Sequence, residues 1–195
     1  MSPVICMVAD RRRAGGEDGL VRRVADAARS GVDLVQIRER DLDGGPLLRL
    51  VSRCVAAVAS TQARVIVNER LDVALAAEAH GVHLREDSMP APRARTIAPP
   101  GFIVGRSVHS ADGVRIETER GGLDYLIFGP VYPTASKAGH AGVGVEVLRE
   151  VVRATPLPVL AIGGITRDRI AGIMHAGAAG FAAISLFDTW SGRDW

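Results

Sequence analysis

Short apolar segments rich in β-branched residues alternate with longer amphipathic segments along the whole chain, and this alternation constrains the fold more than any other feature. Eight apolar segments lie near residues 4–9, 32–38, 64–68, 81–84, 102–108, 125–129, 158–162 and 180–186. Segments with Ala, Leu, Val and Arg at helical spacing lie near residues 17–29, 46–59, 70–79, 91–98, 111–120, 144–154 and 167–176. Strands that alternate with helices are typical of βα units around a parallel sheet. We therefore predict an α/β fold.

Two parallel architectures accommodate these segments. An open doubly wound sheet normally has a Gly-rich dinucleotide turn after its first strand, whereas the first apolar segment here leads into Asp10-Arg11-Arg12-Arg13. We therefore predict a single (β/α)8 TIM barrel over residues 1–195, with a truncated or missing final helix because few residues follow Leu186. Without that helix, apolar surface on the first and last strands would be exposed, which suggests coverage by a partner subunit in a homo-oligomer.

Composition excludes several classes of protein. Apolar residues occupy 47% of the 195 positions, which is enough for a sizeable core. The 24 basic and 22 acidic residues are spread along the chain and nearly cancel, so no nucleic-acid-binding surface is predicted. Cys6 and Cys54 belong to no CxxC or Cys/His cluster, so neither a disulfide framework nor a zinc site is implied. No apolar segment is long enough to span a membrane, and we expect a soluble cytoplasmic protein.

Two loops are candidate anion sites. The seventh apolar segment ends in Gly163-Gly164 and the eighth is followed by Ser185, and loops at these places form the recurrent phosphate site of such barrels. The loop after the sixth segment, 129–143, is Gly-rich and long enough for a mobile lid. It offers the hydroxyls of Thr134 and Ser136 and the ammonium of Lys137 to a second anion. The alternatives are a simple tight turn and a solvated polar loop.

Polar residues also end the second to fifth apolar segments, where the active site of a barrel lies. Period-two alternation places Gln36, Arg38 and Arg40 on one face. A buried arginine needs an ion pair or an anionic ligand, so Arg38 either pairs with a residue such as Glu69 or faces a ligand. Further polar residues at the same rim are Asn68, His83, Arg85, Glu86, Asp87, Arg106, Ser107 and His109.

Three histidines are candidate general bases, because imidazole titrates near neutral pH. His83 and His109 end the fourth and fifth apolar segments, and His140 lies in the Gly-rich loop. The alternatives are a hydrogen-bonded structural role for His83 and His109 and simple solvent exposure for His140.

Taken together, these segments resemble the thiamine phosphate synthase/TenI family over essentially the whole chain. The most specific are QIRER (36–40), NERLDVAL (68–75), GVHL (81–84), GRSVHS (105–110), the loop 129–137 and IGGI (162–165). In the synthase branch, the resemblance implies that a pyrimidine pyrophosphate loses pyrophosphate and that the nitrogen of a thiazole phosphate attacks the carbocation-like pyrimidine. The thiazole phosphate would be held by Gly163, Gly164 and Ser185. The pyrophosphate would be held by Gln36, Arg38, Arg40, Asn68, Ser107, Thr134, Ser136 and Lys137.

The chain departs from the synthase pattern where that branch binds Mg²⁺. The two metal-binding aspartates of the family fall on Glu69 and Ser88, and a lysine that ends the second strand falls on Arg40. The remaining candidate metal ligands are Glu69 and, in place of the carboxylate missing at Ser88, Asp87 or Glu86, through their carboxylate oxygens. The resemblance therefore implies Mg²⁺ as cofactor for a synthase and no cofactor for a tautomerase.

The TenI branch consists of thiazole tautomerases, which aromatise thiazole carboxylate phosphate by moving a proton without metal. The 38–40 and 105–110 segments are closer to this branch, although its base histidine falls on Pro130 here. A substitute base would be His83, His109, His140 or Glu69. We favour a tautomerase, with a thiamine phosphate synthase as the alternative and a non-catalytic barrel that binds thiazole or thiamine phosphate as a third hypothesis.

Overall fold

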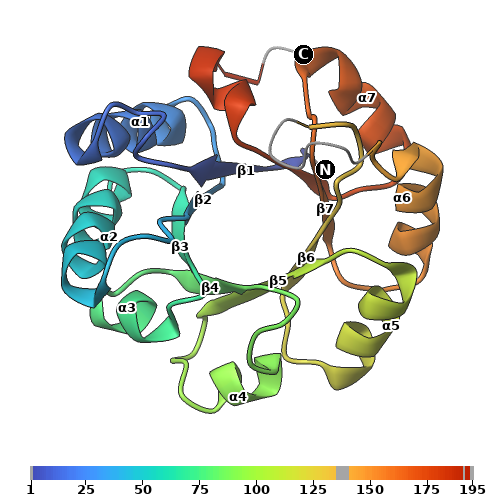
Figure 1. Ribbon diagram of the computed structural model, residues 1–195, viewed down its shortest axis with the longest axis horizontal. Helices are drawn as coiled ribbons and strands as arrows, with labels where there is room; N and C mark the ends of the chain where they lie inside the picture. Colours follow the sequence, from blue (N-terminus) through green and yellow to red (C-terminus); the bar gives the residue numbers. More distant parts are fainter. Residues whose placement is uncertain (1, 135–140, 191, 194–195) are drawn as a thin grey trace.

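The computed structural model describes residues 2–134, 141–190 and 192–193 of the chain. Its strands form a closed parallel barrel in chain order, and helices surround it (Figure 1). The strands are β1 (Val4–Ala9), β2 (Leu34–Ile37), β3 (Arg64–Asn68), β4 (Gly81–Leu84), β5 (Ile103–Val108), β6 (Tyr125–Phe128), β7 (Val159–Ile162) and β8 (Gly180–Ala183). The helices are α1 (Glu17–Arg29), α2 (Gly44–Val58), α3 (Leu71–Ala76), α4 (Ala91–Arg95), α5 (Ala111–Arg120), α6 (Gly144–Arg153) and α7 (Arg167–His175). The predicted (β/α)8 barrel is confirmed.

The helices pack on the barrel through apolar residues at helical spacing. In α1, for example, Leu20, Val24 and Ala27 lie three or four positions apart and are buried against the strands. Short strands such as β2 and β6 are buried along their whole length, as expected for a parallel sheet covered by helices. Among the described residues, no helix has the length and apolarity needed to cross a membrane.

Side chains that point inward fill the N-terminal half of the barrel with a separate apolar core. This core includes Cys6, Leu34, Ile66, Tyr125 and Leu160, each from a different strand. Gly105 on β5 is paired in register with Tyr125 on β6. A Cβ atom added to Gly105 would lie 2.1 Å from Cζ of Tyr125, so the glycine makes room for the aromatic ring.

The barrel closes without an eighth α-helix. A 3₁₀ helix, η2 (Ser185–Thr189), follows β8 and lies between α7 and α1 in Figure 1. Its Leu186 and Phe187 are buried in the same apolar core as Ile5 of β1 and Phe181 of β8, which are both fully buried. The prediction that a truncated helix leaves these two strands exposed is therefore wrong for the described chain, because η2 replaces the helix within the subunit.

The C-terminal residues are also tied to the start of the barrel. The side chain of Arg193 donates to the carbonyl of Pro3 at 2.9 Å and pairs with Asp33 at 2.8 Å. Asp33 in turn accepts a hydrogen bond from the backbone N–H of Ile5 at 2.7 Å. These contacts hold Arg193 against the N-terminal end of β1.

Replacing Gly105 by Ala should lower the free energy of unfolding by about 1–3 kcal/mol, because the new methyl group overlaps the buried Tyr125 ring. Gly172→Ala is the matched control, since Gly172 lies exposed in α7 with its nearest neighbour 3.5 Å from an added Cβ. This control should be neutral or stabilise the protein by about 0.5–1 kcal/mol. Urea denaturation measures both changes, and equal stabilities for the two variants would contradict the packing described.

Candidate functional site

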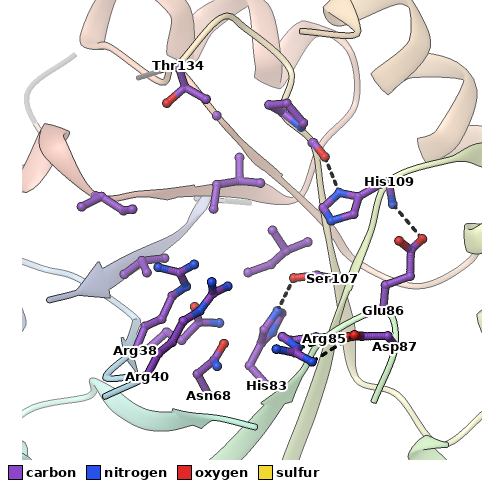
Figure 2. A pocket seen from close by; sticks show the side chains of 18 residues that line it. Arg38, Arg40, Asn68, His83, Arg85, Glu86, Asp87, Ser107, His109 and Thr134 are labelled. Carbon is purple, nitrogen blue, oxygen red and sulfur yellow. Dashed lines mark hydrogen bonds and ion pairs between the residues drawn. The ribbon is translucent and has the colours of Figure 1, made fainter. Parts of the chain in front are cut away.

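A cavity of about 480 Å³ opens at the C-terminal ends of the strands (Figure 2). One part of its wall is apolar and consists of Val8, Ile127, Ile162 and Ile184. Another part lies at the ends of β2 to β5 and is polar, with the predicted residues Gln36, Arg38, Arg40, Asn68, His83 and Ser107. Inward alternation along each strand brings these distant residues together. The cavity therefore has an apolar side and a cationic, hydrogen-bonding side.

The cationic side holds two arginines from the end of β2. The guanidinium groups of Arg38 and Arg40 point into the cavity, and within the described parts of the chain neither has an ion-pair partner. Burial lowers the pKa of Arg38, and the neighbouring Arg40 lowers it further. The nearby Nε2 of Gln36 is buried with no hydrogen-bond partner among these residues. Burial of the Arg38 charge and of the unpaired Gln36 amide both cost free energy. An anionic ligand would offset both costs, because it would stabilise the positive charge and accept a hydrogen bond from the amide.

The predicted alternative of an ion pair between Arg38 and Glu69 is wrong. One carboxylate oxygen of Glu69 accepts the backbone N–H of Arg85 at 2.7 Å, and the other lies 3.4 Å from Nε of Arg85. Glu69 has a positive φ of 65° at the end of β3, which turns its side chain towards the β4–α4 loop. Arg38 therefore remains available to a ligand.

A buried hydrogen-bonded chain fixes the Ser107 hydroxyl on the polar wall. Nδ1 of His83 lies 3.1 Å from the Tyr125 hydroxyl, and Nε2 lies 2.8 Å from Oγ of Ser107. The buried tyrosine must donate its proton to Nδ1, so Nε2–H donates to Ser107. The Ser107 hydroxyl then has its own hydrogen left to donate into the cavity.

Burial, together with the charge of Arg106, lowers the pKa of His83 to about 3. The imidazole therefore stays neutral in the folded protein near neutral pH and is a weak proton acceptor. The geometry favours the structural alternative for His83, in which it orients Ser107.

His109 has a different environment at the exposed edge of the cavity. Its Nδ1–H donates to the carbonyl oxygen of Gly129 at 2.6 Å, so the neutral ring has its lone pair on Nε2. Pro130, the next residue, lines the same cavity. Among the described residues Nε2 has no hydrogen-bond partner, and it lies next to the position on which the base of the TenI branch falls in this sequence. His140, the third candidate, lies outside the described residues.

Two carboxylates expected to bind Mg²⁺ are both engaged by one arginine. Nε and Nη2 of Arg85 each lie 3.0 Å from an oxygen of Asp87, and Arg85 also contacts Glu69. Magnesium requires free oxygen ligands in near-octahedral geometry, and a guanidinium beside those oxygens would repel it. The residues therefore do not fit a preformed magnesium site.

Arg106 does not lie at the rim, where the sequence interpretation places it. Ser107 points into the barrel, so alternation turns Arg106 outward, where it is fully buried. Its Nη1 donates to the carbonyls of Arg85 at 2.7 Å and Glu86 at 3.1 Å, and its Nη2 donates to that of Met89. Its Nε lies 3.1 Å from a carboxylate oxygen of Glu117. Arg106 thus fixes the β4–α4 loop. The outward direction of its side chain could have been predicted from the alternation of inward and outward residues along β5.

A second cavity, of about 340 Å³, adjoins the first and shares Thr134, Ile162, Gly163 and Ile184 with it. Its wall includes the three residues predicted to hold a thiazole phosphate, Gly163, Gly164 and Ser185. Positive φ angles of 100° and 62° at the two glycines turn the backbone before α7. Ser136 and Lys137 of the predicted anion loop lie outside the described residues.

Two arginines that sequence reasoning missed also line the second cavity. Arg169 donates to the carbonyl of Gly164 at 2.7 Å and lies over the Tyr132 ring, 4.6 Å from its centroid. Arg13, from the loop after β1, pairs with Asp188 of η2. The position of Arg13 just after the first strand was the available signal, because every such position faces this rim.

Comparisons with known proteins agree with one another. A family model described as thiamine monophosphate synthase matches residues 5–187. The thiamine-phosphate synthase of Chlorobium luteolum is 37% identical over 185 residues, which cover 94% of this chain and 84% of the relative. The thiamine-phosphate synthase of Methanoculleus marisnigri is 44% identical over 162 residues, which cover 82% of this chain and 75% of the relative. The structure of thiamine phosphate pyrophosphorylase from Pyrococcus furiosus matches with a TM-score of 0.81 and 34% identity, covering 93% of this chain and 85% of that chain.

The depressed pKa of His83 predicts a specific pH dependence of stability. The unfolded chain binds a proton at this histidine below a pKa of 6.5, whereas the folded chain does so only near pH 3. Stability should therefore fall as the pH falls through this window, by up to about 1.4 kcal/mol per pH unit from His83 alone. Urea denaturation of His83→Gln should give a correspondingly shallower profile. The quantity compared is the slope of the free energy of unfolding against pH. Equal slopes for the wild type and the variant would refute the lowered pKa of His83.

Proposed function

The chain belongs to the thiamine monophosphate synthase family, and on that premise we propose that it joins a pyrimidine pyrophosphate to a thiazole phosphate. The names of its relatives support this synthase alternative over the tautomerase that the sequence segments favour. The observation that carries the proposal is the pair of adjoining cavities, each with its own set of groups suited to an anion. A reaction between two phosphorylated substrates needs both.

Each cavity suits one substrate. Arg38 and Arg40, with the donors of Ser107 and Gln36, are suited to a pyrophosphate in the first cavity. The Gly163-Gly164 turn and Ser185 are suited to the phosphate of the thiazole in the second. The shared apolar wall, which includes Ile162 and Ile184, would contact the two rings between these anionic ends. The reacting atoms would then meet where the cavities join.

In the proposed reaction, the bond between the pyrimidine methylene carbon and the pyrophosphate oxygen breaks, and its electron pair leaves with pyrophosphate. The thiazole nitrogen donates its lone pair to that carbon and becomes the positively charged nitrogen of thiamine phosphate. Arg38 and Arg40 would stabilise the charge that develops on the leaving group, and Ser107 would donate to it. Val8 and Ile127 would exclude water from the carbocation-like carbon. No protein nucleophile is needed.

Proton transfer on a thiazole carboxylate phosphate is a second candidate function. It is favoured by one observation, the free Nε2 of His109 beside Pro130. In that case His109 would act as the base and the first cavity would hold the thiazole ring. Loss of proton exchange in His109→Gln, with thiazole phosphate binding retained, would support this function.

We expect the purified protein to convert pyrimidine pyrophosphate and thiazole phosphate into equal amounts of thiamine phosphate and pyrophosphate, measured by chromatography and a coupled pyrophosphate assay. Arg38→Ala should lower kcat/KM about 10–100-fold, because it removes a charge-assisted contact worth about 1.5–3 kcal/mol. Arg93→Ala, which removes an exposed arginine on α4, is the matched control and should have no effect. Absence of thiamine phosphate, with metal-free proton exchange on the thiazole substrate instead, would favour the tautomerase.

Gly164→Val should weaken binding of thiazole phosphate at least about tenfold, measured by calorimetry. An added Cβ would lie 2.4 Å from the carbonyl oxygen of Pro133, and φ at Gly164 is 62°, so the anion-binding turn must move. Gly101→Val is the matched control, because φ at Gly101 is 78° and nothing lies within 4 Å of an added Cβ. Gly101 precedes β5 and so lies at the end of the barrel away from the cavities. Unchanged affinity in Gly164→Val would remove this turn from the site.

A further inference from the structure

The β4–α4 loop brings a third guanidinium to the first cavity. Arg85 lies at the start of this loop and lines the cavity together with Arg38 and Arg40 (Figure 2). Its side chain lies beside two carboxylates, with contacts of 3.0 Å to Asp87 and 3.4 Å to Glu69. Its backbone N–H binds Glu69 as well, at 2.7 Å. Arg85 is therefore held by both residues that the sequence assigns to a metal ion.

The loop that carries Arg85 is hydrogen-bonded to a buried arginine of β5. The buried guanidinium of Arg106 donates to the Arg85 carbonyl at 2.7 Å and to two further carbonyls of the loop. Arg106 is itself paired with Glu117, which is also buried. Breaking such a buried pair is costly, because it leaves an uncompensated charge. The core thus fixes the backbone of Arg85 at the rim, and the contacts with Glu69 and Asp87 place its guanidinium.

The local chemistry matches a fixed cation. A divalent ion would neutralise Glu69 and Asp87 and present positive charge to a phosphate oxygen. Arg85 contacts the same two carboxylates, of which its single positive charge offsets one. It also has one terminal nitrogen, Nη1, that no hydrogen bond or ion pair within the described chain engages. A planar guanidinium is suited to bind phosphate oxygens in this way.

We propose that Arg85 takes the place of the divalent cation, so that Arg38, Arg40 and Arg85 together bind a pyrophosphate group without metal. This inference rests on the proposed function only in taking pyrophosphate as the ligand. It departs from the magnesium dependence that the family resemblance implies. It also gives a physical reason for Ser88, because a second metal-binding carboxylate is superfluous where no metal binds.

The test is calorimetric titration of the whole protein with inorganic pyrophosphate, in EDTA and in excess Mg²⁺. For the wild type, we expect affinities in the two conditions that agree within about threefold. Arg85→Ala should weaken binding in EDTA about 10–100-fold, and Mg²⁺ should restore much of the loss because the guanidinium no longer occupies Asp87 and one oxygen of Glu69. Arg93→Ala is the control for removing one arginine charge, and circular dichroism verifies that each variant is folded.

Three outcomes are distinguishable. Wild-type binding that requires Mg²⁺, by tenfold or more, overturns the role of Arg85 and leaves the proposed function standing. Unchanged affinity of folded Arg85→Ala in EDTA also overturns it. Failure of the wild type to bind pyrophosphate in either condition contradicts the proposed function, and the inference about Arg85 falls with it. The wild-type comparison alone decides the question if the variant does not fold.

Discussion

Closure of eight parallel strands into a barrel is the constraint on which both the core and the site depend. Each strand must turn every second side chain inward, and the interior is too narrow to leave those side chains in water. Towards the N-terminal ends the inward residues are apolar, such as Leu34 and Ile66. Two positions further along the same strands they are Gln36 and Asn68, which line the cavity. The alternation of inward and outward side chains along each strand therefore places both the apolar core and, towards the C-terminal ends of the strands, the polar residues of the cavity.

Buried polar side chains hold the hydrogen-bond donors of the cavity in a fixed arrangement. Tyr125 and His83, both buried in the barrel, set the direction of the Ser107 hydroxyl. Arg106, buried behind β5, fixes the loop that carries Arg85. Burying such groups is costly unless each is hydrogen-bonded, so these residues support a fixed arrangement of donors. A preorganised donor set is what stabilisation of a leaving pyrophosphate requires.

The barrel and most of its rim could be predicted from the sequence, because both follow from strand alternation. Arg38 and Ser107 reach the cavity as that period requires. The contacts of long side chains were less predictable. Glu69 contacts Arg85 and not Arg38, because the positive φ of Glu69 turns its side chain away from the strand direction. The closure by η2 was also missed, since a 3₁₀ helix has no 3.6-residue pattern to detect. The reaction could not be predicted from the sequence, because the synthase and tautomerase branches that it resembles bind a similar phosphate.

A crystal structure of the protein with pyrophosphate and thiazole phosphate bound together would show whether the two anions occupy separate, adjoining cavities. We expect pyrophosphate within hydrogen-bond distance of Arg38 and Arg40, and the thiazole phosphate against the backbone of Gly163 and Gly164. Both phosphates in the same cavity, or pyrophosphate bound away from the two arginines, would contradict it.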